Sequence, residues 1–122
     1  MTRYLIFLSL LAPLAGWGAD PVRGREVVLA RGDGNCLLCH ALPGAGRPAG
    51  NLGPSLAGVG SRLTEAEIRG HIVDASRFNP DTAMPPYGRS AGLHAVAPQY
   101  RGKALLTPQQ IDDAAAYLAT LK

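Results

Sequence analysis

The sequence contains little cysteine, few aromatic residues and no long hydrophobic run. Two cysteines are too few for a disulfide framework or for a zinc site made of four cysteines. The mainly apolar run from Tyr4 to Ala12 is much shorter than the about 20 residues that a membrane-spanning helix requires. Basic residues are scattered rather than clustered, so we expect no nucleic-acid partner. No alternating pattern of useful length predicts a β-strand, which leaves an all-α fold with long connections.

Both cysteines stand in one short motif, Cys36-Leu37-Leu38-Cys39-His40. Cys-x-x-Cys-His is the attachment signature of a covalent c-type haem, because two thiols one helical turn apart can add to the two vinyl groups of a porphyrin. The adjacent imidazole of His40 then lies beneath the iron. A structural zinc site would need a second pair of Cys or His ligands, and a thioredoxin-like redox pair would be expected beside a βαβ pattern. A plain disulfide between Cys36 and Cys39 is also possible.

Residues 1–19 have the pattern of a secretory signal peptide. One basic residue, Arg3, precedes the apolar run, and small residues follow it around Gly16, Gly18 and Ala19. We therefore predict cleavage after Gly18 or Ala19, export to the periplasm and no stable membrane anchor. An uncleaved anchor is the competing interpretation. Export agrees with the haem motif, since haem is attached to such motifs outside the cytoplasm.

The remaining domain, residues 20–122, is small and poor in aromatic side chains. Four aromatic residues are left after removal of the signal peptide, namely Phe78, Tyr87, Tyr100 and Tyr117. A chain this short has difficulty in building an adequate core, and such domains commonly depend on a covalent staple or a cofactor. A porphyrin would supply a large flat apolar body for Leu, Val and Ile side chains. The composition therefore favours a prosthetic group independently of the motif.

The first predicted helix precedes the haem motif. Arg23 to Ala30 has apolar residues available for a buried face, and Asp20-Pro21 marks its start. After the motif, Ala41 to Gly53 is rich in Gly and Pro, which predicts an irregular loop. The two cysteines are therefore expected between a helix and a long connection.

Two capping boxes predict two further helices. Thr64-Glu65-Ala66-Glu67 opens a helix that is expected to reach about Ser76, with an apolar face that contains Ile68 and Ile72. Thr107-Pro108-Gln109-Gln110 opens the last helix, where proline sits at the tolerated first position. Apolar residues recur there with helical spacing at Ile111, Ala114, Ala115, Leu118 and Leu121. Asp112 and Asp113 are expected to point away from this face.

The sixth ligand of the iron decides what a haem site can do, because a closed position restricts it to electron transfer. Met84 is the only methionine left after removal of the signal peptide, and two prolines that follow it stiffen its segment. It lies between two predicted helices and can approach the haem face opposite His40. Met84 could instead fill the core, and His71 or His94 could bind the iron in its place. His and Met together would close the site and raise the reduction potential.

With these residues placed, the chain resembles a class I cytochrome c, and more closely the SoxX family, the monohaem subunits of the SoxAX complexes of bacterial sulfur oxidation. Two motifs, Gly34 to His40 and Gly53 to Gly60, are generic to class I cytochromes. The run Asn79-Pro80-Asp81-Thr82-Ala83-Met84-Pro85-Pro86-Tyr87, with Tyr100 to Lys103 and Leu105 to Thr107 after it, is similar to SoxX in particular. The resemblance covers nearly all of the mature chain.

The resemblance implies a role for each residue of the site. Cys36 and Cys39 would carry the thioether bonds of one haem c, and His40 and Met84 would be its axial ligands. In class I cytochromes the carbonyl of the Gly-Pro motif accepts a hydrogen bond from the ring of the haem histidine, so Pro54 would orient His40.

The resemblance also implies a fold and a function. The fold is that of class I cytochromes c, with helices and long irregular loops around one covalent haem and with N- and C-terminal helices that cross near Gly24 and Tyr117. The implied function is that of a non-catalytic subunit of an L-cysteine S-thiosulfotransferase. SoxX pairs with SoxA, a dihaem or monohaem cytochrome, and relays electrons from the coupling of thiosulfate to the carrier protein SoxY towards an acceptor cytochrome.

Two other functions compete with this one. A free periplasmic shuttle between a dehydrogenase and an oxidase would carry a charged ring for transient docking, whereas the segments that flank Cys39 and Met84 are neutral. A ligand-binding haem sensor would leave the sixth position open. Residues 87–106 are long enough to contact a partner or to cover the haem, and the sequence leaves both interpretations open.

Overall fold

The computed structural model describes residues 18–122, so residues 1–17 of the predicted signal peptide lie outside the described part. The helices are α1 (Pro21–Leu29), α2 (Val59–Arg62), α3 (Glu65–Asp74) and α4 (Pro108–Ala119), with short 3-10 turns η1 (Cys36–Leu38), η2 (Ala75–Arg77) and η3 (Pro98–Tyr100). Residues 18–122 contain no strand, which agrees with the predicted all-α class. None of the helices in this range is long and apolar enough to cross a membrane.

Capping side chains set where the helices begin. Asp20 accepts a hydrogen bond from the backbone of Val22 at 2.8 Å, so α1 starts two residues before the predicted Arg23 and ends one residue before Ala30. Both predicted capping boxes form, with Thr64 at the start of α3 and Thr107 at the start of α4. α3 ends at Asp74, and the chain continues as the 3-10 turn η2. The last residues of the predicted helix are therefore 3-10 rather than α-helical.

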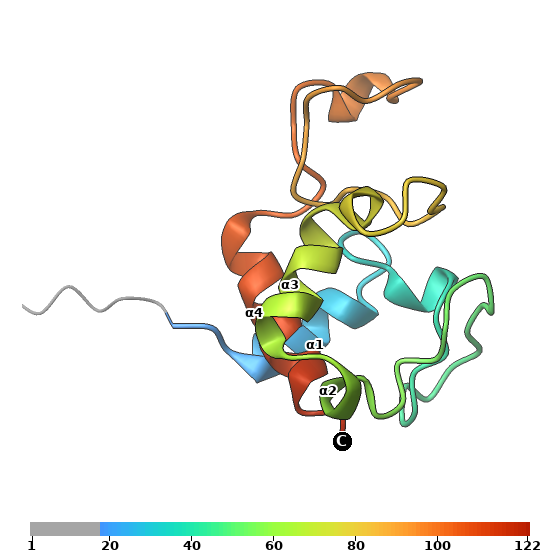
Figure 1. The fold of residues 1–122 in the computed structure, drawn as a ribbon, viewed down its shortest axis with the longest axis vertical. Helices are drawn as coiled ribbons and strands as arrows, with labels where there is room; N and C mark the ends of the chain where they lie inside the picture. Colours follow the sequence, from blue (N-terminus) through green and yellow to red (C-terminus); the bar gives the residue numbers. More distant parts are fainter. Residues whose placement is uncertain (1–17) are drawn as a thin grey trace, which may run out of the picture.

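Helices α1 and α4 cross in close contact, and the two remaining helices pack against α4 (Figure 1). The closest approach is at Gly24, where a Cβ atom would lie 1.8 Å from the carbonyl oxygen of Asp113 and 2.9 Å from the Cβ of Tyr117. Only a residue without a side chain fits there. The crossing near Gly24 and Tyr117 that the resemblance implied is therefore confirmed.

The expectation that Asp113 points away from the packed face was wrong. Its side chain is 2% exposed and lies between α1 and α4. The carboxylate accepts hydrogen bonds from Arg23 Nε at 2.8 Å, from the backbone nitrogen of Asp20 at 2.7 Å and from Gln109 Nε2 at 2.9 Å. These bonds, that of Arg23 above all, hold the pKa of Asp113 below its ordinary value. A buried carboxylate with this many partners joins the two helices instead of disrupting their contact.

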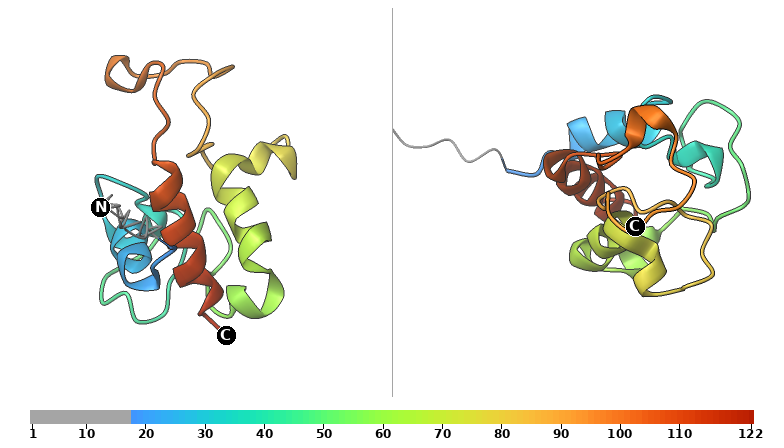
Figure 2. Two further views of the ribbon diagram at one scale, coloured as in Figure 1. Left: turned by 90° about the vertical axis from the view of Figure 1, so that its left-hand side faces the viewer. Right: turned by 90° about the horizontal axis from the view of Figure 1, so that it is seen from above.

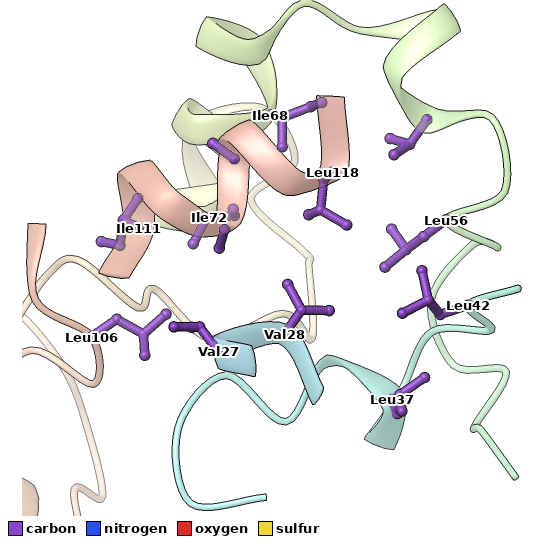
Figure 3. Close-up of a cluster of buried hydrophobic side chains, with 13 residues drawn as sticks. Val27, Val28, Leu37, Leu42, Leu56, Ile68, Ile72, Leu106, Ile111 and Leu118 are labelled. Carbon is purple, nitrogen blue, oxygen red and sulfur yellow. The ribbon is translucent and has the colours of Figure 1, made fainter. Parts of the chain in front are cut away.

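The hydrophobic core lies between the three longer helices and the segments around the haem motif (Figure 3). α3 contributes Ile68 and Ile72, as predicted, and α4 contributes Ile111, Ala114, Ala115 and Leu118. The irregular segments contribute buried leucines on the other side, at Leu37, Leu42, Leu56 and Leu106. Helices and loops therefore share one core, which places the motif at its edge.

Residues 90–105, which we call the arm, rise beyond the N-terminal end of α4 and stand off from the helices in two views (Figure 1 and Figure 2). The base of the arm is closed by a hydrogen bond from the backbone nitrogen of Leu106 to the carbonyl oxygen of Tyr87, at 3.0 Å. The arm contains η3 and no buried residue. It is therefore a projection from the helical body and contributes nothing to the core.

Replacement of Gly24 by alanine tests the helix crossing. The added methyl group would collide with the backbone of α4 at Asp113. Backbone atoms cannot relieve the clash by a change of rotamer, as the end of a flexible side chain could. We expect Gly24→Ala to lower the free energy of unfolding by about 3 kcal/mol, measured by urea denaturation. Gly32→Ala is the matched control, because a Cβ at Gly32 meets nothing within 4 Å. Equal stability of the two variants would contradict the assigned crossing.

Candidate haem site

The cysteine motif forms a single tight turn. Asn35, in the left-handed region at φ 44°, precedes η1, and the backbone nitrogens of Cys39 and His40 both donate to the carbonyl oxygen of Cys36, at 3.1 and 2.9 Å. Both thiols are free and half-buried, so the disulfide considered from the sequence does not form in this structure. The turn holds the two thiols and the imidazole in a fixed relation.

The environment of the cysteines also disfavours a redox pair and a zinc site. Burial raises the pKa of the Cys36 thiol to about 11, whereas a redox-active cysteine needs a lowered pKa to supply a thiolate. Within residues 18–122, no group of three or more His, Cys, Asp or Glu side chains is arranged to hold a metal ion directly. In the described part of the chain, the surroundings of the two thiols therefore favour neither a redox pair nor a zinc site.

The imidazole of His40 is held on one side by a backbone carbonyl. His40 Nδ1 lies 2.6 Å from the carbonyl oxygen of Pro54. Because a carbonyl oxygen can only accept, Nδ1 carries the proton and Nε2 is the nitrogen left to bind a metal. The ring lies directly against Gly53, where a Cβ atom would come within 2.4 Å of His40 Cε1. The Gly-Pro pair thus supplies both the space for the ring and the acceptor that fixes its tautomer.

The irregular loop after the motif is anchored by its backbone. Gly50 donates to the carbonyl oxygen of Leu37 and Gly53 donates to that of Cys39, both at 2.8 Å. A Cβ at Gly50 would lie 2.0 Å from the carbonyl oxygen of Leu38, so the loop approaches the motif more closely than a side chain permits. The predicted irregular loop is confirmed, and these contacts show that it returns along the motif.

Met84 lies in a turn between η2 and the arm. Its side chain is half-buried and packs against the same core cluster as Cys36. Its backbone nitrogen donates to Thr82 Oγ1 at 3.1 Å, and one turn earlier the backbone nitrogen of Asp81 donates to Asn79 Oδ1, also at 3.1 Å. These side-chain bonds fix a segment that has no helical hydrogen bonds of its own.

The two histidines that compete with Met84 lie in different surroundings. His71 is half-buried on α3, and its ring stacks on that of Phe78 with a centroid distance of 4.1 Å. His94 is exposed on the arm. Met84, in comparison, packs against the core cluster, as Cys36 does.

Tyr87 joins the Met84 segment to the cysteine motif, a role that no sequence motif indicated. Its hydroxyl donates to the carbonyl oxygen of Gly34 at 2.7 Å, and its backbone nitrogen donates to the carbonyl oxygen of Ile72 at 3.2 Å. Burial raises the pKa of Tyr87 to about 12, so the phenol keeps the proton that it donates at neutral pH. The only sequence signal was its place at the end of the SoxX-like run, three residues after Met84.

Comparison with known proteins agrees with this geometry. The sequence model of the cytochrome c family matches residues 22–122. The chain belongs to the cytochrome c family. A chain of the crystal structure of SoxXA from P. pantotrophus is similar to this cytochrome, with a TM-score of 0.77 and 34% sequence identity over 91% of this chain and 88% of that chain. No curated protein matches the sequence.

These findings confirm three of the predictions. The all-α class I cytochrome c fold, the resemblance to SoxX and the single covalent haem c are all supported by the family and by the similar structure. The residues present fit this cofactor. Two free thiols and an imidazole share one turn, and the lack of a side chain at Gly53 makes room for the ring of His40. Met84 is partly buried and packs against the core.

Replacement of Tyr87 by phenylalanine tests the connection between the two segments. We expect Tyr87→Phe to lower the free energy of unfolding by about 1 kcal/mol, because the carbonyl of Gly34 loses its donor. It should also weaken the red absorption band that a methionine–iron bond gives in the oxidised protein. Tyr100→Phe, on the exposed arm, is the control and should change neither quantity. A Tyr87→Phe protein as stable as the control would show that the hydrogen bond holds nothing in place.

Proposed function

We propose that this cytochrome is the electron-transfer subunit of a SoxAX-type complex in the periplasm. The observation that carries the proposal is its similarity to a chain of SoxXA, at 34% identity over 91% of its length. The presence of the free Cys36 and Cys39 beside a fixed His40 supports the same conclusion. In this proposal residues 1–19 are a cleaved signal peptide and residues 20–122 are the mature cytochrome domain.

The cysteine motif and Met84 would hold the haem. Cys36 and Cys39 would form the thioether bonds, and His40 and Met84 would bind the iron. When bound, the haem supplies an iron that accepts and donates one electron. A thioether favours the ferrous state more than a second imidazole would, so the choice of Met84 raises the reduction potential.

The remaining residues of the site position these ligands. The carbonyl of Pro54 keeps the proton on Nδ1 of His40 and leaves Nε2 for the iron. Tyr87 holds the Met84 segment against the loop before Cys36. With His40 and Met84 both bound to the iron, no coordination position would remain for a substrate. The chemistry that remains is the transfer of electrons to and from partners.

A partner subunit completes the proposed function. The electrons come from the coupling of thiosulfate to a SoxY-like carrier at a SoxA-like cytochrome subunit, and they pass through this chain to an acceptor cytochrome. The chain is then the electron-accepting subunit of a heterodimeric enzyme and has no active site of its own. The similarity to a chain of SoxXA favours this function over a free shuttle between a dehydrogenase and an oxidase.

Isolation of the native protein tests the proposed function. We expect the haem of this chain to co-purify from periplasmic extract with a second haem-bearing subunit, and the pair to be reduced when thiosulfate and the carrier protein are added. Gel filtration with haem staining and absorption spectra would show both. A protein that runs alone and is reduced by a dehydrogenase instead would identify it as a shuttle.

Replacement of Met84 tests the assignment of the sixth ligand. Met84→Ala should open this position, lower the reduction potential and allow the reduced protein to bind carbon monoxide, because water or an exogenous ligand takes the place of the thioether. Redox titration and absorption spectra would measure these changes. His71→Ala and His94→Ala are the controls and should keep the wild-type spectrum. A wild-type spectrum in Met84→Ala would show that another residue is the ligand.

A further inference from the structure

The arm, residues 90–105, is held firmly at its base. Besides the bond between Leu106 and Tyr87, the side chain of Arg89 donates to Asp74 Oδ2 at 2.9 Å, at the end of α3. Asp74 is buried, and it also accepts a hydrogen bond from Ser76 Oγ at 2.6 Å. Hydrogen bonds from Ser76 and Arg89 hold the pKa of Asp74 below its ordinary value, so this anchor is charged at neutral pH. The arm is therefore presented at a fixed place on the body.

Beyond its base the arm buries no side chain within the described chain. None of residues 90–105 is buried. Ordering the backbone costs about 1–2 kcal/mol per residue, and contacts within the arm offset little of this cost. Loops of this length without a core of their own are usually functional or disordered. A contact outside the chain would supply the missing burial.

The composition of the arm fits a protein partner. Tyr100 is 44% exposed and Leu105 is 38% exposed, and a shallow concavity between the two limbs is lined by Ser90, Leu93, Ala95, Val96, Arg101 and Gly102. Exposed tyrosine and arginine side chains are the types that dominate the binding energy of protein interfaces. The arm also carries Arg101 and Lys103 and has no acidic residue. Its charge therefore complements an acidic surface.

We propose that the arm is the docking surface for the partner cytochrome subunit and that it contacts an acidic, partly apolar face of that subunit. This proposal rests on the proposed function, which supplies the partner. The arm rises beyond the N-terminal end of α4, whereas the segment with Cys36 and His40 lies at the side of the helical body (Figure 1). This placement favours partner contact over the other interpretation of the segment, a cover for the haem.

A shortened arm tests the proposal. The closed base allows residues 91–104 to be replaced by a short Gly-Ser linker while the bonds from Arg89 to Asp74 and from Leu106 to Tyr87 are kept. The isolated variant should keep the wild-type haem spectrum, reduction potential and midpoint of unfolding, because no arm residue is buried. Its affinity for the recombinant SoxA-like subunit, measured by calorimetry, should fall about tenfold or more.

Point variants separate the apolar and the charged contributions. Tyr100→Ala should weaken binding about tenfold. The double variant Arg101→Glu with Lys103→Glu should weaken it further and reverse its dependence on salt, because salt then screens a repulsion instead of an attraction. Arg25→Glu, on the exposed side of α1, is a charge-reversal control away from the arm and should bind as the wild type does.

The outcomes distinguish the two proposals. A wild-type protein that does not bind the SoxA-like subunit overturns the proposed function and the docking surface together. If the wild type binds and the shortened variant binds equally well, the docking surface is wrong and the proposed function stands. A shortened variant that gains carbon monoxide binding or changes its spectrum would identify the arm as a cover for the haem.

Discussion

The contact between α1 and α4 at Gly24 is the constraint on which the rest of the structure depends. The carbonyl oxygen of Asp113 lies where any other residue would have its Cβ, and the carboxylate of Asp113 binds Arg23 and the backbone of Asp20. Backbone and side chain of one residue thus fix both the distance between the helices and their register. The position of α1 also fixes the start of the cysteine motif, because the backbone nitrogen of Gly34 donates to the carbonyl oxygen of Val27 in the last turn of α1.

The opposite side of the site depends on loop hydrogen bonds rather than on helix packing. Met84 lies in a turn, and Tyr87 connects its segment to α3, to the base of the arm and to Gly34. A side chain held in this way keeps its place without belonging to a helix. In the proposed function, a thioether and an imidazole whose residues are far apart in the sequence would bind one cofactor.

Local signals made much of this structure predictable from the sequence. The capping boxes at Thr64 and Thr107 lie within four residues each, and the cysteine motif is a single turn. The burial of Asp113 and the role of Tyr87 were not predictable, because their partners Arg23 and Gly34 are 90 and 53 residues away. α2 was missed as well, since its four residues are too few to show a helical period.

The body and the arm of this cytochrome have separable physical roles. Every group that positions the candidate ligands, from Pro54 to Tyr87, lies in the body, and no residue of the arm is buried in the core. Changes in the body therefore act on the haem site and on the stability of the fold. Changes in the arm leave the core intact and act on what the chain contacts. In the proposed function, the partner determines which electrons the haem carries. The choice of partner can therefore change through the arm without any change in the residues of the body.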